Sequence, residues 1–235
     1  MCEWIVRAFS RRRSIYYRRL HVKGLVPTRC SRAMKSAIIL AGGRSRRLGK
    51  DKGLLFFGGK TLIEKVYERI DSVAEEVVIA VHTERQKRAY SRLIGNCYFS
   101  VDESSYAGPL SGLSSGLKNV TGEKVAVVGC DMPFISPELM QLLYELSREY
   151  DASIPRWPSG YIEPLHAVYD TDSCRTAVHR ALRRGRSDMR SMISALPRII
   201  YVSTEAIRRL DPNLKMFTNI NTRSDLLCAR RLLRS

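Results

Sequence analysis

The sequence predicts an α/β fold in which a doubly wound, mostly parallel sheet is covered by helices on both faces. Short, continuously apolar runs at 37–41, 76–81 and 124–129 are typical of strands buried on both faces. Segments with helical periodicity lie between these runs. Regular alternation of strands and helices is the order expected of a parallel sheet with crossover helices.

The individual elements follow from residue 36 onward. The helix over 61–74 has an apolar face built on residues such as Leu62, Val66 and Ile70. Ser136 and Pro137 mark a helix start, because serine caps the free N–H groups and proline is tolerated in the first turn. We expect further helices over 84–94, 110–119, 172–184 and 222–233, and shorter strands over 98–101, 152–154 and 165–169.

Residues 1–35 differ from the rest of the chain. The formal net charge is +17, and this segment holds ten Lys or Arg residues against one acid, Glu3. Its like charges and weak periodicity predict a basic extension that is disordered or not native, with Met34 as a natural first residue. A transit peptide and an RNA-binding arm with stacking tyrosines are the alternatives. We therefore expect one domain over 36–235, with a nucleotide half (36–150) and an acceptor half (151–235).

The remaining composition narrows the class of protein. No apolar run approaches the roughly 18 residues that a membrane span needs, so no membrane association and a cytoplasmic location are expected. The cysteines form no Cys-x-x-Cys pair and no zinc-finger spacing, which predicts buried, reduced thiols. These cysteines are Cys2, Cys30, Cys97, Cys130, Cys174 and Cys228.

A glycine-rich loop follows the first strand and predicts a phosphate site. Glycines let backbone N–H groups approach phosphate oxygens closely, and several arginines and lysines follow within ten residues. The spacing matches neither the P-loop nor the Gly-x-Gly-x-x-Gly motif. The candidate nucleotide-binding residues are Leu40, Ala41, Gly42, Gly43 and Lys52, with Arg47 beside them; a basic surface loop is the alternative.

Two acids end later strands. Asp131, after the strand 124–129, is placed to bind Mg²⁺ that bridges phosphate oxygens, or else caps the turn toward Pro133. Asp102 ends the strand 98–101 and either contacts the nucleotide or is a solvated loop acid. His166 lies on a strand, where a structural role is the default and a ligand contact the alternative.

These residues resemble the signature of the MobA-like molybdenum cofactor guanylyltransferases. The likeness starts with Leu-Ala-Gly-Gly-x-Ser-x-Arg-Leu-Gly-x-Asp-Lys at 40–52 and covers about residues 36–233. It continues through Gly-Pro-Leu-Ser-Gly (108–112), Cys-Asp-Met-Pro-Phe (130–134), Pro-Leu-His-Ala-Val-Tyr (164–169) and Asn-Ile-Asn-Thr (219–222). The order of the later motifs narrows a wide nucleotidyltransferase superfamily to this group.

The resemblance implies a Rossmann-like three-layer sandwich with a mostly parallel sheet, and a Mg²⁺-dependent enzyme. Such an enzyme transfers GMP from GTP to the phosphate of molybdopterin, the molybdenum cofactor, and releases pyrophosphate. The backbones of residues 40–42 would hold the nucleotide, Lys52 would bind phosphate, Asp102 the nucleotide, and Asp131 both nucleotide and metal. Catalysis would rest on Lys52, Arg47 and Asp131. Partners would be GTP and molybdopterin, with room for contact with other molybdenum cofactor biosynthesis proteins.

The chain departs from the family pattern at three points. Leu48 replaces the usual Met and Gly53 the frequent Ala, and both changes are expected to be harmless. His82 stands near the end of a strand, 76–81, where bacterial members can place a nucleotide-binding Asn, and His82 is a candidate substitute. The rival functions are cytidylyl transfer to molybdopterin, guanylyl transfer to cobinamide phosphate, and, in another class, nucleic-acid binding through the basic arm.

Overall fold

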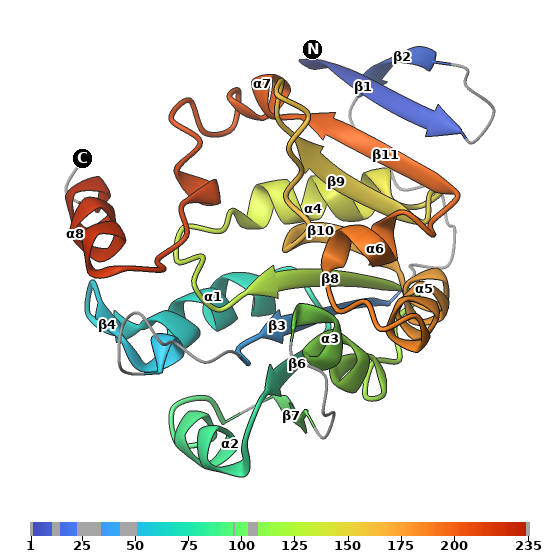
Figure 1. The fold of residues 1–235 in the computed structure, drawn as a ribbon. Helices are drawn as coiled ribbons and strands as arrows, with labels where there is room; N and C mark the ends of the chain where they lie inside the picture. The colour runs from blue at the N-terminus through green and yellow to red at the C-terminus, as the bar shows by residue number, and fades with distance from the viewer. Residues whose placement is uncertain are drawn as a thin grey trace.

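A nine-stranded sheet forms the centre of the computed structural model of the protein (Figure 1). The structure describes residues 2–10, 15–22, 34–42, 51–95, 97–102 and 108–233. The strand order is β2-β1-β11-β9-β10-β8-β3-β6-β7. From β11 to β7 the strands run parallel except for β10, which is antiparallel to both of its neighbours. The predicted mostly parallel sheet is confirmed.

Every strand and helix expected after residue 36 is present, with ends shifted by a few residues. The strands are β3 (Lys35–Leu40), β6 (Glu76–Val81), β7 (Tyr98–Val101), β8 (Lys124–Gly129), β9 (Ala152–Arg156) and β10 (His166–Asp170). The helices are α1 (Leu62–Asp71), α2 (Glu84–Tyr90), α3 (Pro109–Leu117), α4 (Pro137–Leu146), α5 (Thr171–Arg183) and α8 (Arg223–Leu232). Ser136 caps α4 by accepting a hydrogen bond from the Leu139 N–H at 3.0 Å, as its sequence predicts.

Several elements were not expected from the sequence. In the acceptor half these are α6 (Met189–Ile193), β11 (Arg198–Ser203), α7 (Thr204–Ile207) and the 3₁₀ turn η2 (Lys215–Phe217). The nucleotide half adds η1 (Lys52–Leu54) and a small hairpin of β4 (Phe56–Phe57) and β5 (Lys60–Thr61). Gly58 and Gly59 turn this hairpin with φ of 56° and 87°, values that favour glycine.

Helices cover both faces of the sheet and complete a three-layer sandwich. Because side chains alternate along a strand, β3 sends Ile39 to one face and Ile38 to the other. Helices α1, α4 and α7 pack on the Ile39 face, whereas α3, α5 and α6 pack on the Ile38 face. Two separate apolar clusters result, one on each side of the sheet, and together they hold the strands in place.

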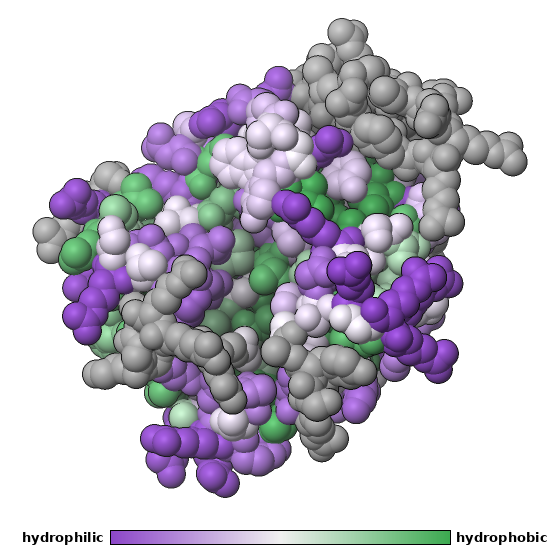
Figure 2. All heavy atoms as spheres, viewed as in Figure 1, coloured by the Kyte–Doolittle hydropathy of each residue, from purple (hydrophilic) through white to green (hydrophobic). Residues whose placement is uncertain are grey.

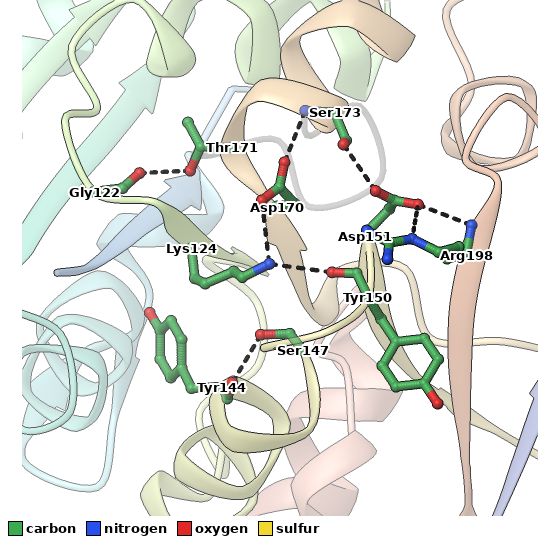
Figure 3. A network of polar contacts seen from close by, with 10 residues as sticks. All are labelled: Gly122, Lys124, Tyr144, Ser147, Tyr150, Asp151, Asp170, Thr171, Ser173 and Arg198. Carbon is green, nitrogen blue, oxygen red and sulfur yellow. Dashed lines mark hydrogen bonds and ion pairs between the residues drawn. The ribbon is translucent and has the colours of Figure 1, made fainter. Parts of the chain in front are cut away.

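The amino ends of β8, β9 and β11 and the carboxyl end of β10 are fixed by a polar network (Figure 3). Lys124 Nζ donates to Asp170 Oδ2 and to the Tyr150 carbonyl, each at 3.1 Å. Asp151 accepts from the Arg198 N–H at 2.8 Å and from Ser173 Oγ at 2.9 Å. Buried charges are tolerated when paired in this way. These hydrogen bonds link neighbouring strands at the end of the sheet opposite the carboxyl ends of the parallel strands.

The N-terminal segment, expected to be a disordered or non-native extension, contains two strands in its described residues. Residues Cys2–Ser10 (β1) and Ile15–Val22 (β2) form an antiparallel hairpin, and β1 pairs antiparallel with β11. The sequence of these stretches offers a reason, because β-branched and aromatic residues such as Ile5, Val6 and Tyr16 favour strands. The domain boundary near residue 35 stays a prediction.

We expect a protein that begins at Met34 to keep its melting temperature to within a few degrees. Truncation leaves β11 parallel to β9 and leaves both apolar clusters intact, because their buried members start at Ala37. Thermal unfolding of the full and truncated chains, followed by circular dichroism, measures the difference. A large drop would show that the hairpin packs as part of the domain and that the boundary is wrong.

The thiols agree with the sequence interpretation in part. Among the described residues, Cys130 and Cys174 are buried and free, and burial raises the pKa of Cys174 to about 12. Cys97 is half-buried and also free, whereas Cys228 is exposed on α8, so the expectation that Cys228 is buried was wrong.

The sequence analysis expected no membrane-spanning segment. In the described part of the chain, none of the helices is long and apolar enough to cross a bilayer.

Candidate active site

The residues that the sequence singles out follow parallel strands of the sheet, at the carboxyl end of each strand. Gly42 comes shortly after β3, His82 directly after β6, Asp102 after β7 and Asp131 shortly after β8. Because these strands are parallel, their carboxyl ends meet at one edge, where open α/β sheets bind ligands. The structure brings the predicted residues to this edge, and their binding roles remain predictions.

Lys52 and Asp131 face each other at this edge. Lys52 Nζ lies 3.2 Å from Asp131 Oδ2 and also donates a hydrogen bond to Asn221 Oδ1. The two charged side chains are 23% and 20% exposed, so both are sheltered yet reachable. The Asp131 carbonyl accepts from the Ile220 N–H at 2.9 Å. In the structure, therefore, Asp131 contacts Lys52 and the C-terminal segment, and its role in binding stays a prediction.

Asn221 belongs to the Asn-Ile-Asn-Thr motif (219–222), but sequence reasoning assigned it no contact with the site. Its N–H and that of Thr222 each donate to Asp225 Oδ2 at 2.8 Å, and Thr222 Oγ1 accepts from the Asp225 N–H at 3.1 Å. The hydrogen bond from Asn221 is the main reason that the pKa of Asp225 is lowered. This capping box fixes the start of α8 and so aims Asn221 at Lys52. The Thr-x-x-Asp pattern directly after Asn221 was the available signal.

Asp51 braces the loop that carries Lys52. Its Oδ1 accepts from the Gly53 N–H at 3.0 Å and from the Tyr90 hydroxyl at 2.5 Å, and its Oδ2 accepts from Gln86 Nε2 at 2.9 Å. Tyr90 is fully buried, and burial, with help from Asp51, raises the pKa of its hydroxyl. The brace ties the loop to α2, and the sequence pattern gave no signal for Gln86 or Tyr90 as its partners.

The brace explains why glycine at position 53 is needed in this chain. A Cβ at Gly53 would overlap the Tyr90 hydroxyl and approach Tyr90 Cζ to 2.8 Å. We expect Gly53→Ala to lower the free energy of unfolding by about 1–3 kcal/mol, because overpacking forces buried groups apart. Chemical denaturation measures this. Gly95→Ala is the matched control, since a Cβ there meets no atom within 4 Å; equal stability of both variants would contradict the argument.

The Asp102 side chain, directly after β7, is held by contacts with neighbouring side chains. Its carboxylate accepts from Ser111 Oγ at 2.6 Å, and His82 Nδ1 lies 3.9 Å from its second oxygen. The Asp102 side chain is only 9% exposed, so it is not a solvated loop acid. Ser111 lies on α3, which begins after Gly108 (φ 136°), where an added Cβ would approach the Ser187 carbonyl oxygen to 2.7 Å. His82, 43% exposed, is free to meet a ligand from the solvent side.

The backbone of the glycine loop is only partly free. The Leu40 carbonyl accepts from the Cys130 N–H at 3.1 Å, and the Ala41 N–H donates to the Ala80 carbonyl at 2.9 Å. Gly42 is exposed and lies against the backbone of His82. The other predicted residues of this loop, Gly43 and Arg47, lie outside the residues that the structure describes.

Comparison with known proteins identifies the family. A family model described as a MobA-like NTP transferase domain matches residues 37–199. A molybdenum cofactor guanylyltransferase of Desulfosudis oleivorans is 31% identical over 193 residues, which are 81% of this chain and 92% of the relative. The chain belongs to the MobA-like NTP transferase family. It is therefore a nucleotidyltransferase, as the sequence predicted.

Further MobA-like relatives agree with this assignment. A Methanosarcina mazei protein named "Probable molybdenum cofactor guanylyltransferase" is 38% identical over 204 residues, covering 83% of this chain and 89% of the relative. The crystal structure of molybdopterin-guanine dinucleotide biosynthesis protein A from Archaeoglobus fulgidus has a TM-score of 0.74 at 30% identity, covering 86% of this chain and 99% of that one. The predicted Rossmann-like sandwich of this MobA-like chain is thereby confirmed.

Proposed function

We propose that the protein transfers GMP from GTP to the phosphate of molybdopterin, forming molybdopterin guanine dinucleotide and pyrophosphate. The observation that carries the proposal is the Lys52–Asp131–Asn221 cluster at the carboxyl edge of the sheet. It places one cation and one carboxylate beside the loop that follows β3. The relatives' names, molybdenum cofactor guanylyltransferase, supply the nucleotide and the acceptor.

The chemistry is a displacement at the α-phosphorus of GTP by the acceptor phosphate. Lys52, held by Asn221 and Asp131, meets the phosphates and stabilises the charge that develops as pyrophosphate leaves, with Arg47 in the same role. Residues 40–43 approach the nucleotide through their backbones, and Asp102 accepts hydrogen bonds from its sugar or base. Catalysis then rests on positioning and electrostatics, with no covalent enzyme intermediate.

Mg²⁺ fits the residues at this site. Among the described residues no group of three or more His, Cys, Asp or Glu side chains is placed to enclose a metal. Magnesium in nucleotide enzymes instead binds through one or two carboxylates together with substrate phosphates. Asp131, partly exposed at the sheet edge, provides such a carboxylate. When bound, the ion would neutralise phosphate charge.

Turnover with labelled GTP tests the proposed function directly. The purified protein is incubated with Mg²⁺, α-labelled GTP and molybdopterin, and the labelled dinucleotide and pyrophosphate are measured. We expect both products in equal amounts and only when the acceptor is present. Label transferred to cobinamide phosphate and not to molybdopterin would replace the acceptor in the proposal, and the same assay with CTP tests the other related transferase.

GTP is expected to bind more tightly than ATP. Guanine presents an N1–H and an exocyclic amine, so acceptors placed for these donors lose their partners when adenine binds. Asp102, with one oxygen on Ser111 and the other near His82, is a described acceptor at the nucleotide edge. Titration calorimetry with each nucleotide measures the preference. Equal Kd values for GTP and ATP would count against guanylyl transfer.

A further inference from the structure

Glu163, in the connection between β9 and β10, has a buried carboxylate that takes no part in the reaction proposed above. Glu163 is 9% exposed, and Trp157 Nε1 donates to its Oε1 at 2.7 Å. The Glu163 N–H donates to the Pro155 carbonyl at 3.0 Å, so the backbone of this connection is fixed as well. Burial raises the pKa of Glu163. A carboxylate withdrawn from water is costly unless something binds it, and one neutral N–H is a weak compensation.

The Glu163–Trp157 pair adjoins the active site through one short segment. The Trp157 ring contacts the Phe217 ring at a centroid distance of 5.7 Å, and Phe217 lies in η2, four residues before Asn221. The fully buried His166 ring lies 5.0 Å from the same phenyl ring. His166 also pairs with Val128 on β8, three residues before Asp131. The rings of Trp157, Phe217 and His166 are therefore connected to the end of the sheet that carries the Lys52–Asp131 pair.

The face of the molecule drawn in Figure 2 is apolar at its centre, and many of the described residues around this centre are hydrophilic. The Trp157 side chain is only partly buried, so part of its ring can be contacted. In the described part of the chain, Trp157 Nε1 is the side-chain donor to Glu163, and it uses one acceptor position of a carboxylate that has about four.

The acceptor of the proposed reaction carries a ring that matches this pair. A 2-amino-4-oxopteridine presents an N3–H and a 2-amino group side by side, two parallel donors that a carboxylate accepts together. Its flat ring can lie against an indole or phenyl ring at the same time. The opposite end of the acceptor carries its charged phosphate, which must reach the nucleotide beside Lys52, and Lys52 is hydrogen-bonded to Asn221 at the end of the same segment.

We propose that Glu163, positioned by Trp157, binds the pterin ring of the acceptor through its N3–H and 2-amino group. The proposal rests on guanylyl transfer to molybdopterin and adds the residue that selects the acceptor. A purely structural role for the pair makes a different prediction. Glutamine at position 163 can still accept the Trp157 N–H hydrogen bond, but it offers a single acceptor oxygen and no charge to a ligand.

Binding of two free pteridines by wild-type and Glu163→Gln protein tests the subsite without turnover. Pterin has the 2-amino group, whereas lumazine has an oxygen in its place. We expect the wild type to prefer pterin over lumazine, as measured by titration calorimetry, and Glu163→Gln to abolish the preference. Hydrogen bonds to a charged group imply an affinity loss on the order of tenfold to a hundredfold. An unchanged preference in Glu163→Gln overturns the proposal.

Steady-state kinetics provide the second readout. Glu163→Gln should raise KM for molybdopterin on the order of tenfold or more and leave KM for GTP within about twofold, with an unchanged melting temperature. Asp172→Asn, which neutralises an exposed carboxylate on α5, is the matched control and should change neither KM. Equal changes in both KM values would overturn the assignment. A wild type without transfer activity that still prefers pterin would instead refute the proposed function alone.

Discussion

Replacing Lys52 by alanine is expected to lower kcat for guanylyl transfer on the order of 10²-fold or more. Lys52 is the cation that the structure places against Asp131 and Asn221, so its ammonium group is already oriented when the triphosphate arrives. Loss of one preorganised charge contact to a developing negative charge costs that much. Pyrophosphate release at saturating GTP measures kcat, and the melting temperature shows whether the variant is folded.

Two control lysines make the Lys52 result specific. Lys50→Ala removes a charge two residues away, at a position that the family motif leaves variable. Lys60→Ala removes a half-exposed lysine that pairs with Glu68 on α1, away from the sheet edge. Both variants should retain kcat to within a few-fold. If Lys52→Ala and Lys50→Ala had equal, small effects on kcat/KM, the assignment of the loop would be refuted.

The sequence predicted the strands near the site because each is a local pattern. The β8 run, for instance, is continuously apolar and ends at Gly129, so Asp131 had to follow a buried strand. Parallel topology then placed Asp131 at the same edge as the loop after β3 without any side-chain information. The Lys52–Asp131 contact, across 79 positions of sequence, was not itself predicted from the sequence and is seen only in the structure.

Contacts that depend on unpatterned segments were not predictable in the same way. Asn221 reaches Lys52 only because η2 and the capping box of α8 set the course of the chain, and the segment between them has no periodicity. The hydrogen bonds to Asp51 include one from the hydroxyl of Tyr90 on α2, a residue to which the sequence analysis assigned no role. Its hydroxyl also explains why Gly53, expected to be a harmless replacement, fits this chain where alanine would not.

The structure of the acceptor half (151–235) was harder to predict from the sequence for a related reason. Strand β11 follows Pro197 and carries the short apolar run Ile199-Ile200-Tyr201-Val202. In contrast to β6 and β8, no helix with a periodic apolar face in the sequence leads directly into it. Its pairing with β9 depends on tertiary packing, because no local pattern in the sequence identifies β9 as its neighbour in the sheet. The Trp157–Glu163 pair shares this difficulty, since a long connection between strands has no period to reveal its contacts.

Asp131→Asn is expected to reduce the rate of pyrophosphate release on the order of 10²-fold or more at saturating Mg²⁺. The amide has almost the same size, so the close packing beside Gly129, where an added Cβ would lie 2.6 Å from Asp131 Oδ1, should persist. The substitution changes the charge, and a neutral amide is a poor ligand for Mg²⁺. Its NH₂ group can also turn toward Lys52 Nζ, and two hydrogen-bond donors would then face each other.

Two further measurements separate this explanation from misfolding. The melting temperature of Asp131→Asn should match the wild type to within a few degrees, because the Asp131 carbonyl still accepts from the Ile220 N–H. The Mg²⁺ concentration for half-maximal rate should rise, since the variant relies more on the substrate phosphates to hold the ion. Asp172→Asn, an exposed carboxylate on α5, should change neither value. A wild-type rate in Asp131→Asn would remove Asp131 from the active site, and the Lys52–Asp131 pair would then be a structural ion pair.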